Sequence, residues 1–455
     1  MKEQLKNIRG SITAPCGFRA AGVFCDIKRL GTGKGSNKGA KRDLALIVSE
    51  VPATVAGMFT TNQVCAAPVK VCAERVKKGT AQAIVANSGN ANACTGAQGL
   101  RDALAMTQLA AKELHLPAAH VLVGSTGRIG MSLPMTNVKR GIAEAASMLG
   151  QAPEHAAAVA EAIMTSDTQP KQIAVEFELS GRTVRIGGVC KGAGMIQPGL
   201  SGTRARPPAA PNARPPRGPH ATMLCFLTTD AAIEAGTLQA ALQEAVANSF
   251  NRITVDGDMS TNDTVLALAN GLAGNRRLRA MSRNASVAGA DLARFQSALN
   301  QVAVELAQMI VRDGEGVSRF VTVRVAGAKT FADADAAARA VANSALVKTS
   351  WHGGDPNWGR IIGALGYSAA KVVEEKVDIG YSAPGSRQVL YSLQRGQATQ
   401  ATFKALCAAV DAKEFDLHIN LNLGNASARI YAADLTEAYV DFNKGDVSDP
   451  ASLGG

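Results

Sequence analysis

The sequence predicts a mixed α/β fold, because two kinds of apolar periodicity follow each other along the chain. Short apolar runs between glycine and asparagine turns are typical of strands, and longer stretches with apolar residues three and four positions apart are typical of helices. With 455 residues, of which 46% are hydrophobic, the chain is long enough for two or three domains and a large core. Aromatic residues make up only 4%, so Ala, Val, Leu and Ile must form most of that core. We find no internal repeat.

The first half of the chain is predicted to combine strands with helices that follow or separate them. Apolar runs predict strands at 43–49, 54–60, 82–86 and 120–124. Apolar spacing predicts helices at 99–114, 135–149 and 155–164, and two alternating runs predict a hairpin at 173–178 and 183–188.

The second half continues the same mixture. An apolar strand is predicted at 223–227, and further strands at 320–325, 415–421 and 427–432. Helical periodicity is found at 238–247, 289–311, 333–345 and 401–412.

Composition narrows the class of protein. The N-terminus has no apolar run of signal-peptide length and no stretch of about 18 apolar residues occurs, so we expect a cytoplasmic protein that does not enter a membrane. The net charge of +11 includes arginines in 204–217 and 276–279 without interleaved aromatic residues. This favours a solvated basic surface over a nucleic-acid interface, and it is compatible with acidic small substrates.

The cysteines and histidines predict neither disulfides nor a metal site. The eight cysteines are dispersed without a C-x-x-C pair, and the six histidines do not fall at ligand spacing with them. Reduced, mostly buried thiols are therefore expected.

One segment, 199–220, differs in composition from the rest of the chain. It holds six of the 17 prolines and four arginines, and it shows no periodicity. Such a segment buries little apolar surface, so a flexible, partly extended loop is predicted. It ends directly before a candidate nucleophile.

That candidate is Thr222, within the motif ATML at 221–224. If the bond between Ala221 and Thr222 breaks, the threonine hydroxyl becomes a nucleophile whose own α-amine is the neighbouring base. A free α-amine has a reference pKa of about 7.7–8.0, which suits a general base. Taken alone, the four residues are more often the beginning of a buried strand.

Several polar turns could complete such a site, and each also has an ordinary structural interpretation. The turn at 123–130, which includes Thr126 and Gly127, could stabilise an oxyanion or be a simple glycine turn. Thr165 could bind substrate or cap a helix, and Lys191 could pair with a carboxylate or lie on the surface. Glu315 could hold an ammonium group or face solvent.

Known cofactor motifs are missing from the sequence. The acidic stretch 256–263 lacks the glycine and glutamate of an EF-hand loop. Neither a Walker A motif nor a dinucleotide fingerprint occurs, so no cofactor is predicted.

Seven motif blocks follow one another over essentially the whole chain, at 17–20, 86–96, 125–127, 191–196, 221–224, 255–263 and 355–360. Their order and spacing resemble the ornithine acetyltransferase family, the bifunctional glutamate N-acetyltransferase/ornithine acetyltransferase enzymes of arginine biosynthesis.

The resemblance implies a layered helix–sheet–sheet–helix sandwich of the DmpA/ornithine acetyltransferase type, with a smaller C-terminal α/β lobe at roughly 330–455. It implies autocatalytic cleavage into an α piece (1–221) and a β piece (222–455) that stay together, as a heterotetramer of two of each. The family has a short connection where this chain has 199–220, so it stays open whether cleavage makes Thr222 a new N-terminus.

The resemblance also implies a multifunctional acyltransferase of amino-acid biosynthesis. Thr222 would take the acetyl group of N2-acetylornithine and pass it to glutamate, with acetyl-CoA left open as another donor. Thr126 and Gly127 would form the oxyanion hole, and the substrate would be bound by Thr165, Lys191, Thr222, Glu315, Asn443 and Ser448.

In a substrate with one carboxylate and one ammonium group, Lys191 suits the carboxylate and Glu315 suits the ammonium, although the pairing could be swapped. Two other functions remain. One is a related acyltransferase or amidohydrolase that keeps Thr222 but uses water or another amine as acceptor. The other is a non-cleaving, basic binding relative.

Overall fold

The computed structural model describes residues 5–28, 41–202, 222–279 and 286–444. Within these ranges, ten strands form one large sheet. They are β1 (Lys6–Asn7), β2 (Phe18–Val23), β3 (Leu44–Thr60), β4 (Thr80–Asn90), β5 (Val121–Arg128), β6 (Lys171–Leu179), β7 (Arg182–Lys191), β8 (Leu200–Ser201), β9 (Leu224–Thr229) and β11 (Thr264–Ala269).

This large sheet folds over on itself. Between β5 and β9 lie β4, β3 and β11, which would put the two strands about 19 Å apart if the sheet were flat. A Cβ atom added to Gly124 of β5 would nevertheless lie 3.2 Å from the Phe226 ring of β9. The long strand β3 makes the connection, since its residues 44–49 pair with β2 and its residues 54–59 pair with β11. The result is two sheet layers packed face to face.

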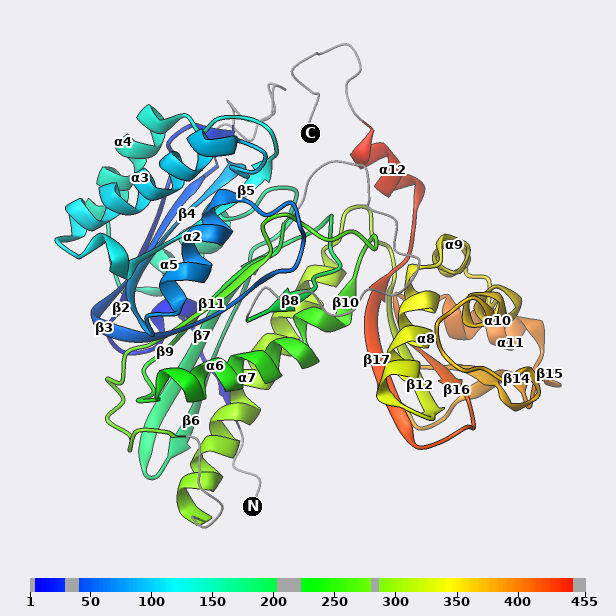
Figure 1. Ribbon diagram of the computed structural model, residues 1–455. Helices are drawn as coiled ribbons and strands as arrows, with labels where there is room; N and C mark the ends of the chain where they lie inside the picture. The colour runs from blue at the N-terminus through cyan, green and yellow to red at the C-terminus, as the bar shows by residue number, and fades with distance from the viewer. Residues whose placement is uncertain (1–4, 29–40, 203–221, 280–285, 445–455) are drawn as a thin grey trace.

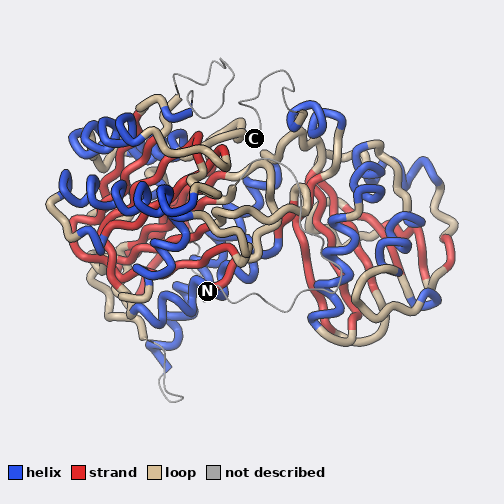
Figure 2. The backbone as a smooth tube through the Cα atoms, turned by 45° about the horizontal axis from the view of Figure 1, so that its top comes forward, coloured by secondary structure: helices blue, strands red, loops and turns tan. Residues whose placement is uncertain are grey.

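Helices cover both outer sides of these layers, which confirms the predicted helix–sheet–sheet–helix sandwich (Figures 1 and 2). The first group packs around β2, β3 and β5 and consists of α2 (Ala67–Val76), α3 (Gly96–Leu114), α4 (Met135–Ser147) and α5 (Pro153–Ala162). The second group packs on β3, β6 and β7 and consists of α6 (Ala235–Asn248) and α7 (Ser286–Arg312).

A second sheet forms the smaller lobe, which Figure 1 draws in yellow to red apart from the green strand β10. Its strands are β10 (Ile253–Thr254), β12 (Phe320–Ala328), β13 (Asp378–Ser382), β14 (Leu390–Gln394), β15 (Gln397–Ala398), β16 (Glu414–Asn420) and β17 (Ala426–Ala433). Its helices are α8 (Phe331–Asn343), α9 (Ala345–His352), α10 (Trp358–Gly366) and α11 (Phe403–Val410). A reciprocal capping box between Thr330 and Asp333 begins α8.

The two lobes are joined at the side where the candidate residues lie. The short strand β10 comes from the chain between α6 and β11 of the large lobe, yet it pairs with β17 of the small one. The last helix, α12 (Glu437–Asn443), follows β17 and returns toward the large lobe (Figure 1). Both connections bring small-lobe residues next to the ends of the central strands.

Two predictions about local structure were wrong. The separate strands at 43–49 and 54–60 are one strand, β3, because Pro52 lies where the pairing with β4 shifts its register and a missing N–H is tolerated. The predicted loop at 199–220 begins with an ordered strand, since β8 pairs with Phe59 and Thr60 of β3. The rest of that segment, from residue 203 on, lies outside the described residues.

All eight cysteines lie in the described ranges and are free thiols, five of them buried. No helix of the described chain is long and apolar enough to cross a membrane.

Candidate active site

The candidate residues meet where the central strands of the large sheet end. β7 runs antiparallel to β9 and ends at Lys191, which pairs with Leu224. β11 runs parallel to β9, with Thr264 beside Leu224. Lys191, Thr222 and Asp263 therefore lie at the same edge of the sheet.

The Thr222 hydroxyl is buried and held by a second hydroxyl. Thr222 is 3% exposed, and its Oγ1 lies 2.8 Å from Oγ of Ser260. Ser260 is itself fixed, because its Oγ accepts the N–H of Asn262 (3.1 Å) and its carbonyl accepts the Thr60 hydroxyl (2.7 Å). The next backbone N–H along the chain, that of Met223, donates to Asp263 Oδ1 at 2.9 Å. Thr222 thus has little freedom to turn away.

Asn262 connects the loop beside Thr222 to the other layer of the sandwich. Its amide nitrogen donates to the carbonyls of Ala91 (2.6 Å) and Ser125 (2.9 Å), which belong to the segment after β4 and to β5. These bonds place Thr126, the residue after Ser125, near the loop that carries Ser260.

Thr126 and Gly127 have the features expected of an oxyanion hole. Thr126 is fully buried, and its hydroxyl has no hydrogen-bond partner within the described residues. Gly127 has φ +126°, and a Cβ atom there would lie 2.4 Å from the carbonyl carbon of Gly89. Only glycine fits this close approach of β4 and β5. A buried hydroxyl without a partner is costly, so it is typical of a group that serves a bound ligand.

Lys191 belongs to a fully buried charged network. Its Nζ donates to Thr165 Oγ1 at 2.5 Å and lies 3.6 Å from Asp167 Oδ2. Asp167 also accepts the Lys171 ammonium (2.6 Å) and the backbone N–H of Gly192 (2.7 Å). Lys171 in turn pairs with Asp313.

The network settles the charges of these groups. Burial opposes ionisation of Asp167, but Lys191 and Lys171 hold the pKa of its carboxyl well below its usual range. Burial lowers the pKa of Lys191, and Asp167 counteracts this effect. Within the described residues, the carboxylate in direct contact with the buried Lys191 amine is that of Asp167, which Lys171 shares.

Glu315 supplies the opposite charge beside Lys191. Its backbone N–H donates to the carbonyl of Ala193 at 2.9 Å, and its carboxylate accepts the Asn443 side-chain amide at 3.0 Å. The carboxylate lies directly over Gly194, where an added Cβ atom would be 2.3 Å from Oε2. Burial raises the pKa of Glu315, and the polar side chains of Ser166 and Asn443 partly offset that rise, with a smaller contribution from Lys191.

The structure therefore brings together Thr126, Gly127, Thr165, Lys191, Thr222, Glu315 and Asn443. The two other predicted positions, Ala221 and Ser448, lie outside the described residues. Sequence reasoning did not assign roles to Ser260, Asn262, Asp263 and Asp167, which hold the site together. The first three belong to the block 255–263, so the resemblance to the family contained the signal, although side-chain roles could not be taken from it.

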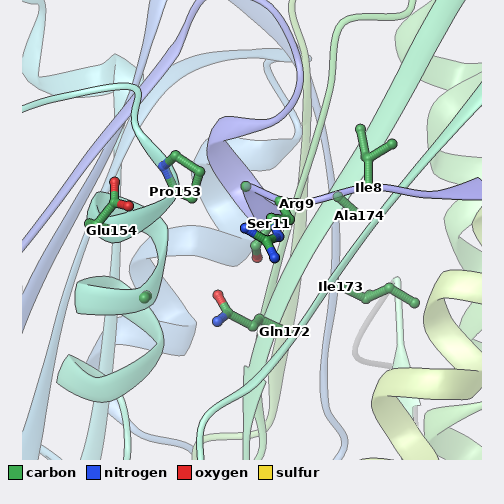
Figure 3. A pocket seen from close by; sticks show the side chains of 10 residues that line it. Ile8, Arg9, Ser11, Pro153, Glu154, Gln172, Ile173 and Ala174 are labelled. Atoms are coloured by element: carbon green, nitrogen blue, oxygen red, sulfur yellow. The ribbon is translucent and has the colours of Figure 1, made fainter.

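One surface pocket of the described chain lies apart from these residues. It has a volume of about 330 Å³ and is lined by residues 8–11, the beginning of α5 and strand β6 (Figure 3). Its lining contains none of the predicted site residues. No group of three or more His, Cys, Asp or Glu side chains in the described part of the chain could hold a metal ion.

The sandwich fold and this set of groups, a held hydroxyl beside a cation and a carboxylate, define an acyltransferase that acts on a small charged substrate. The chain belongs to the ArgJ family, which matches residues 19–445. This confirms the resemblance inferred from the sequence motifs.

Curated relatives match at full length. A protein of Symbiobacterium thermophilum named "Arginine biosynthesis bifunctional protein ArgJ" is 45% identical over 436 residues, covering 96% of this chain and 98% of its own. A protein of Methanocaldococcus jannaschii named "Glutamate N-acetyltransferase" is 41% identical over 445 residues, covering 96% and 99%.

A solved structure of ornithine acetyltransferase from Mycobacterium tuberculosis, complexed with ornithine, is 38% identical and covers 44% of this chain and 100% of its own, with a TM-score of 0.40.

Proposed function

We propose that this chain is an N-acetyltransferase of arginine biosynthesis that moves the acetyl group of N2-acetylornithine to glutamate. Membership of the ArgJ family supports the activity, as do the names of the full-length relatives. The observation that carries the proposal is the Thr222 hydroxyl, buried at the start of β9 and held by Ser260 beside Lys191 and Glu315. A cytoplasmic location follows from this biosynthetic role.

The nucleophile becomes active through cleavage of the bond between Ala221 and Thr222. The threonine then attacks the acetyl carbonyl, while its α-amine accepts the hydroxyl proton. Thr126 and Gly127 stabilise the oxyanion, and the proton passes to the departing amine of ornithine. Glutamate reverses these steps and leaves as N-acetylglutamate. No cofactor takes part, and acetyl-CoA would enter only as an alternative acetyl donor.

The charged groups select the substrate. Lys191 binds the α-carboxylate of N2-acetylornithine, and Glu315 with Asn443 binds its side-chain ammonium. Thr165 orients Lys191 through the 2.5 Å hydrogen bond. Ser448 completes the substrate site from the C-terminal end.

The two pieces, 1–221 and 222–455, stay together after cleavage. β9 and β11 of the β piece lie between β7 and β3 of the α piece in one sheet, and two such pairs form the heterotetramer. Light scattering of the purified enzyme should give about twice 47.0 kDa.

The test combines intact mass with product analysis. The wild-type chain should yield two species instead of one of 47.0 kDa, and Thr222→Ala should remain whole. Thr228→Ala is the matched control, because it removes another buried hydroxyl of β9, one that donates to Ile12 far from the site. A whole wild-type chain without transferase activity would favour the basic binding relative.

Product analysis separates transfer from hydrolysis. Ornithine and N-acetylglutamate should form in equal amounts, and release of ornithine should depend on added glutamate. Acetate release without glutamate, at the same rate, would instead support an amidohydrolase. Thiol release from acetyl-CoA in the presence of glutamate tests the second donor.

A further inference from the structure

Asp263 is a buried carboxyl group with one oxygen in use and one unused. It is 0% exposed, and Oδ1 accepts the N–H of Met223 at 2.9 Å. Oδ2 has no hydrogen-bond partner among the described residues. Burial raises the pKa of this carboxyl to about 7. The backbone N–H groups of Met223 and Ser260 oppose this rise in pKa. Because Oδ2 still has no well-aligned donor among the described residues, an additional donor would stabilise the carboxylate.

The backbone nitrogen of Thr222 directly precedes, along the chain, the Met223 nitrogen that Asp263 binds. Bond lengths place the backbone nitrogens of consecutive residues within about 3.7 Å of each other. Since Asp263 already binds the nitrogen of Met223, the nitrogen of Thr222 is one residue's span away. In the uncleaved chain that nitrogen is a neutral amide, whereas cleavage would turn it into an amine that can carry a charge.

The charged groups around Asp263 already have other partners, so the Asp263 carboxylate could still pair with a new cation. Lys191 is the cation that lowers the pKa of Asp263, and Asp256 is the carboxylate that raises it. Lys191 donates to Thr165 and faces Asp167, and Asp256 accepts the N–H groups of Met195 and Ile196. Both therefore have their own partners.

We propose that Asp263 is the positioning residue for the α-amino group of the cleaved protein, with its Oδ2 accepting a hydrogen bond from the amine of Thr222. The inference rests on the proposed cleavage. It completes a three-part arrangement in which a hydroxyl nucleophile is served by a base and the base is oriented by a third group. Ser260 holds the hydroxyl of Thr222, and Asp263 holds its amine.

In the chemical step, the Thr222 oxygen forms a bond to the acetyl carbon while its proton moves to the α-amine. The resulting ammonium lies against the Asp263 carboxylate, which stabilises it. When the amide C–N bond breaks, the ammonium returns the proton to the departing amine of ornithine. The acetyl ester of Thr222 remains, and Asp263 exchanges no proton.

The experiment compares Asp263→Asn with wild type in the cleaved, assembled enzyme. The asparagine oxygen can still accept the Met223 N–H, but the negative charge is lost. An opposite charge within hydrogen-bonding range shifts a pKa by about 1–3 units. In the pH profile of kcat/KM for N-acetylornithine, the acid limb should therefore move to lower pH by at least one unit. At pH 7 kcat should fall at least tenfold, with KM within threefold of wild type.

Asp230→Asn is the matched control. Asp230 is also a buried carboxyl, it follows the opposite end of β9, and it accepts the N–H groups of Cys16 and Arg185. Loss of that charge should lower stability without moving the acid limb. Asp263→Glu keeps the charge and should leave the limb within half a pH unit of wild type.

The outcomes separate this inference from the proposed function. A cleaved, active Asp263→Asn enzyme with an unmoved acid limb would overturn the inference alone, and a wild-type chain that stays whole would overturn both. If neither variant yields cleaved protein, the wild-type amine is titrated by competitive acylation of the β-piece N-terminus. A pKa above the reference of about 7.7–8.0 would support the inference, and one at or below it would refute it.

Discussion

Replacing Lys191 with methionine tests how the site recognises its substrate. The side chain keeps similar length and loses the ammonium that we assign to the α-carboxylate of N-acetylornithine. A hydrogen bond to a charged group contributes about 1.5–3 kcal/mol. At 1.36 kcal/mol per factor of ten, kcat/KM should fall about 13- to 160-fold.

The fold should tolerate this change. Without Lys191, Asp167 keeps the Lys171 ammonium at 2.6 Å and the backbone N–H groups of Gly192 (2.7 Å) and Thr165 (3.0 Å). Lys171→Met is the contrasting control, because it should affect stability instead of substrate recognition: it leaves Asp313 without its buried cation. Breaking such a pair costs about 3–5 kcal/mol, so this variant should lose far more stability in thermal unfolding.

The assay pairs the two enzymes with two donors. N-acetylputrescine is N-acetylornithine without its carboxylate, so wild type should use it poorly and Lys191→Met should lose little more. Such non-additivity measures the contact between the lysine and the carboxylate. If Lys191→Met keeps kcat/KM for N-acetylornithine within twofold, or if both donors lose equally, the assignment is refuted.

Three further predictions follow from the packing around the site. Thr126→Val should lower kcat by about 10²–10³. Its Tm should not fall, because the hydroxyl has no hydrogen-bond partner in the described fold. An unchanged kcat would show that Thr126 is not part of the oxyanion hole. Gly194→Ala should raise KM for N-acetylornithine, since the added methyl displaces the Glu315 carboxylate, and Gly363→Ala, with nothing within 4 Å, should not. The uncleaved Thr222→Ala chain should gain stability in denaturant unfolding as the pH falls from 7 to 5. The fold raises the pKa of Asp263 to about 7, so the native state binds a proton that the unfolded chain does not yet bind. Adding Asp263→Asn should abolish this gain.

The periodicity of the sequence predicted the elements that pack with one face to the core. α3, α7 and the β6–β7 hairpin were predicted within a few residues of their bounds. β11 and α2 were not predicted, although both are part of the core. β11 is buried along its whole length and so lacks the polar–apolar alternation of a half-exposed strand. α2 begins at Ala67 with Pro68 in its first turn, which obscures its helical periodicity.

The site was predicted only in part for a similar reason. Thr222, Lys191 and Glu315 were proposed as site residues because the order of the motifs resembles a known family, since each motif alone also has an ordinary structural interpretation. Ser260 and Asn262 act through hydrogen bonds to residues far away in the chain, such as Asn262 to Ser125. Contacts across 137 positions depend on the fold of the sheet, and neither residue type nor spacing reveals them.

The alternation of strands from the two pieces has a consequence for how the enzyme can be made. Ile186–Lys191 pair with Leu224–Thr229, and Thr54–Phe59 pair with Thr264–Ala269, so the two proposed pieces would share the middle of one sheet. A single chain finds these partners at a rate independent of its concentration, whereas two separate pieces must meet first. If the chain is cleaved as we propose, the protein can fold only once as a single chain. After denaturation, recovery of activity should then depend on protein concentration.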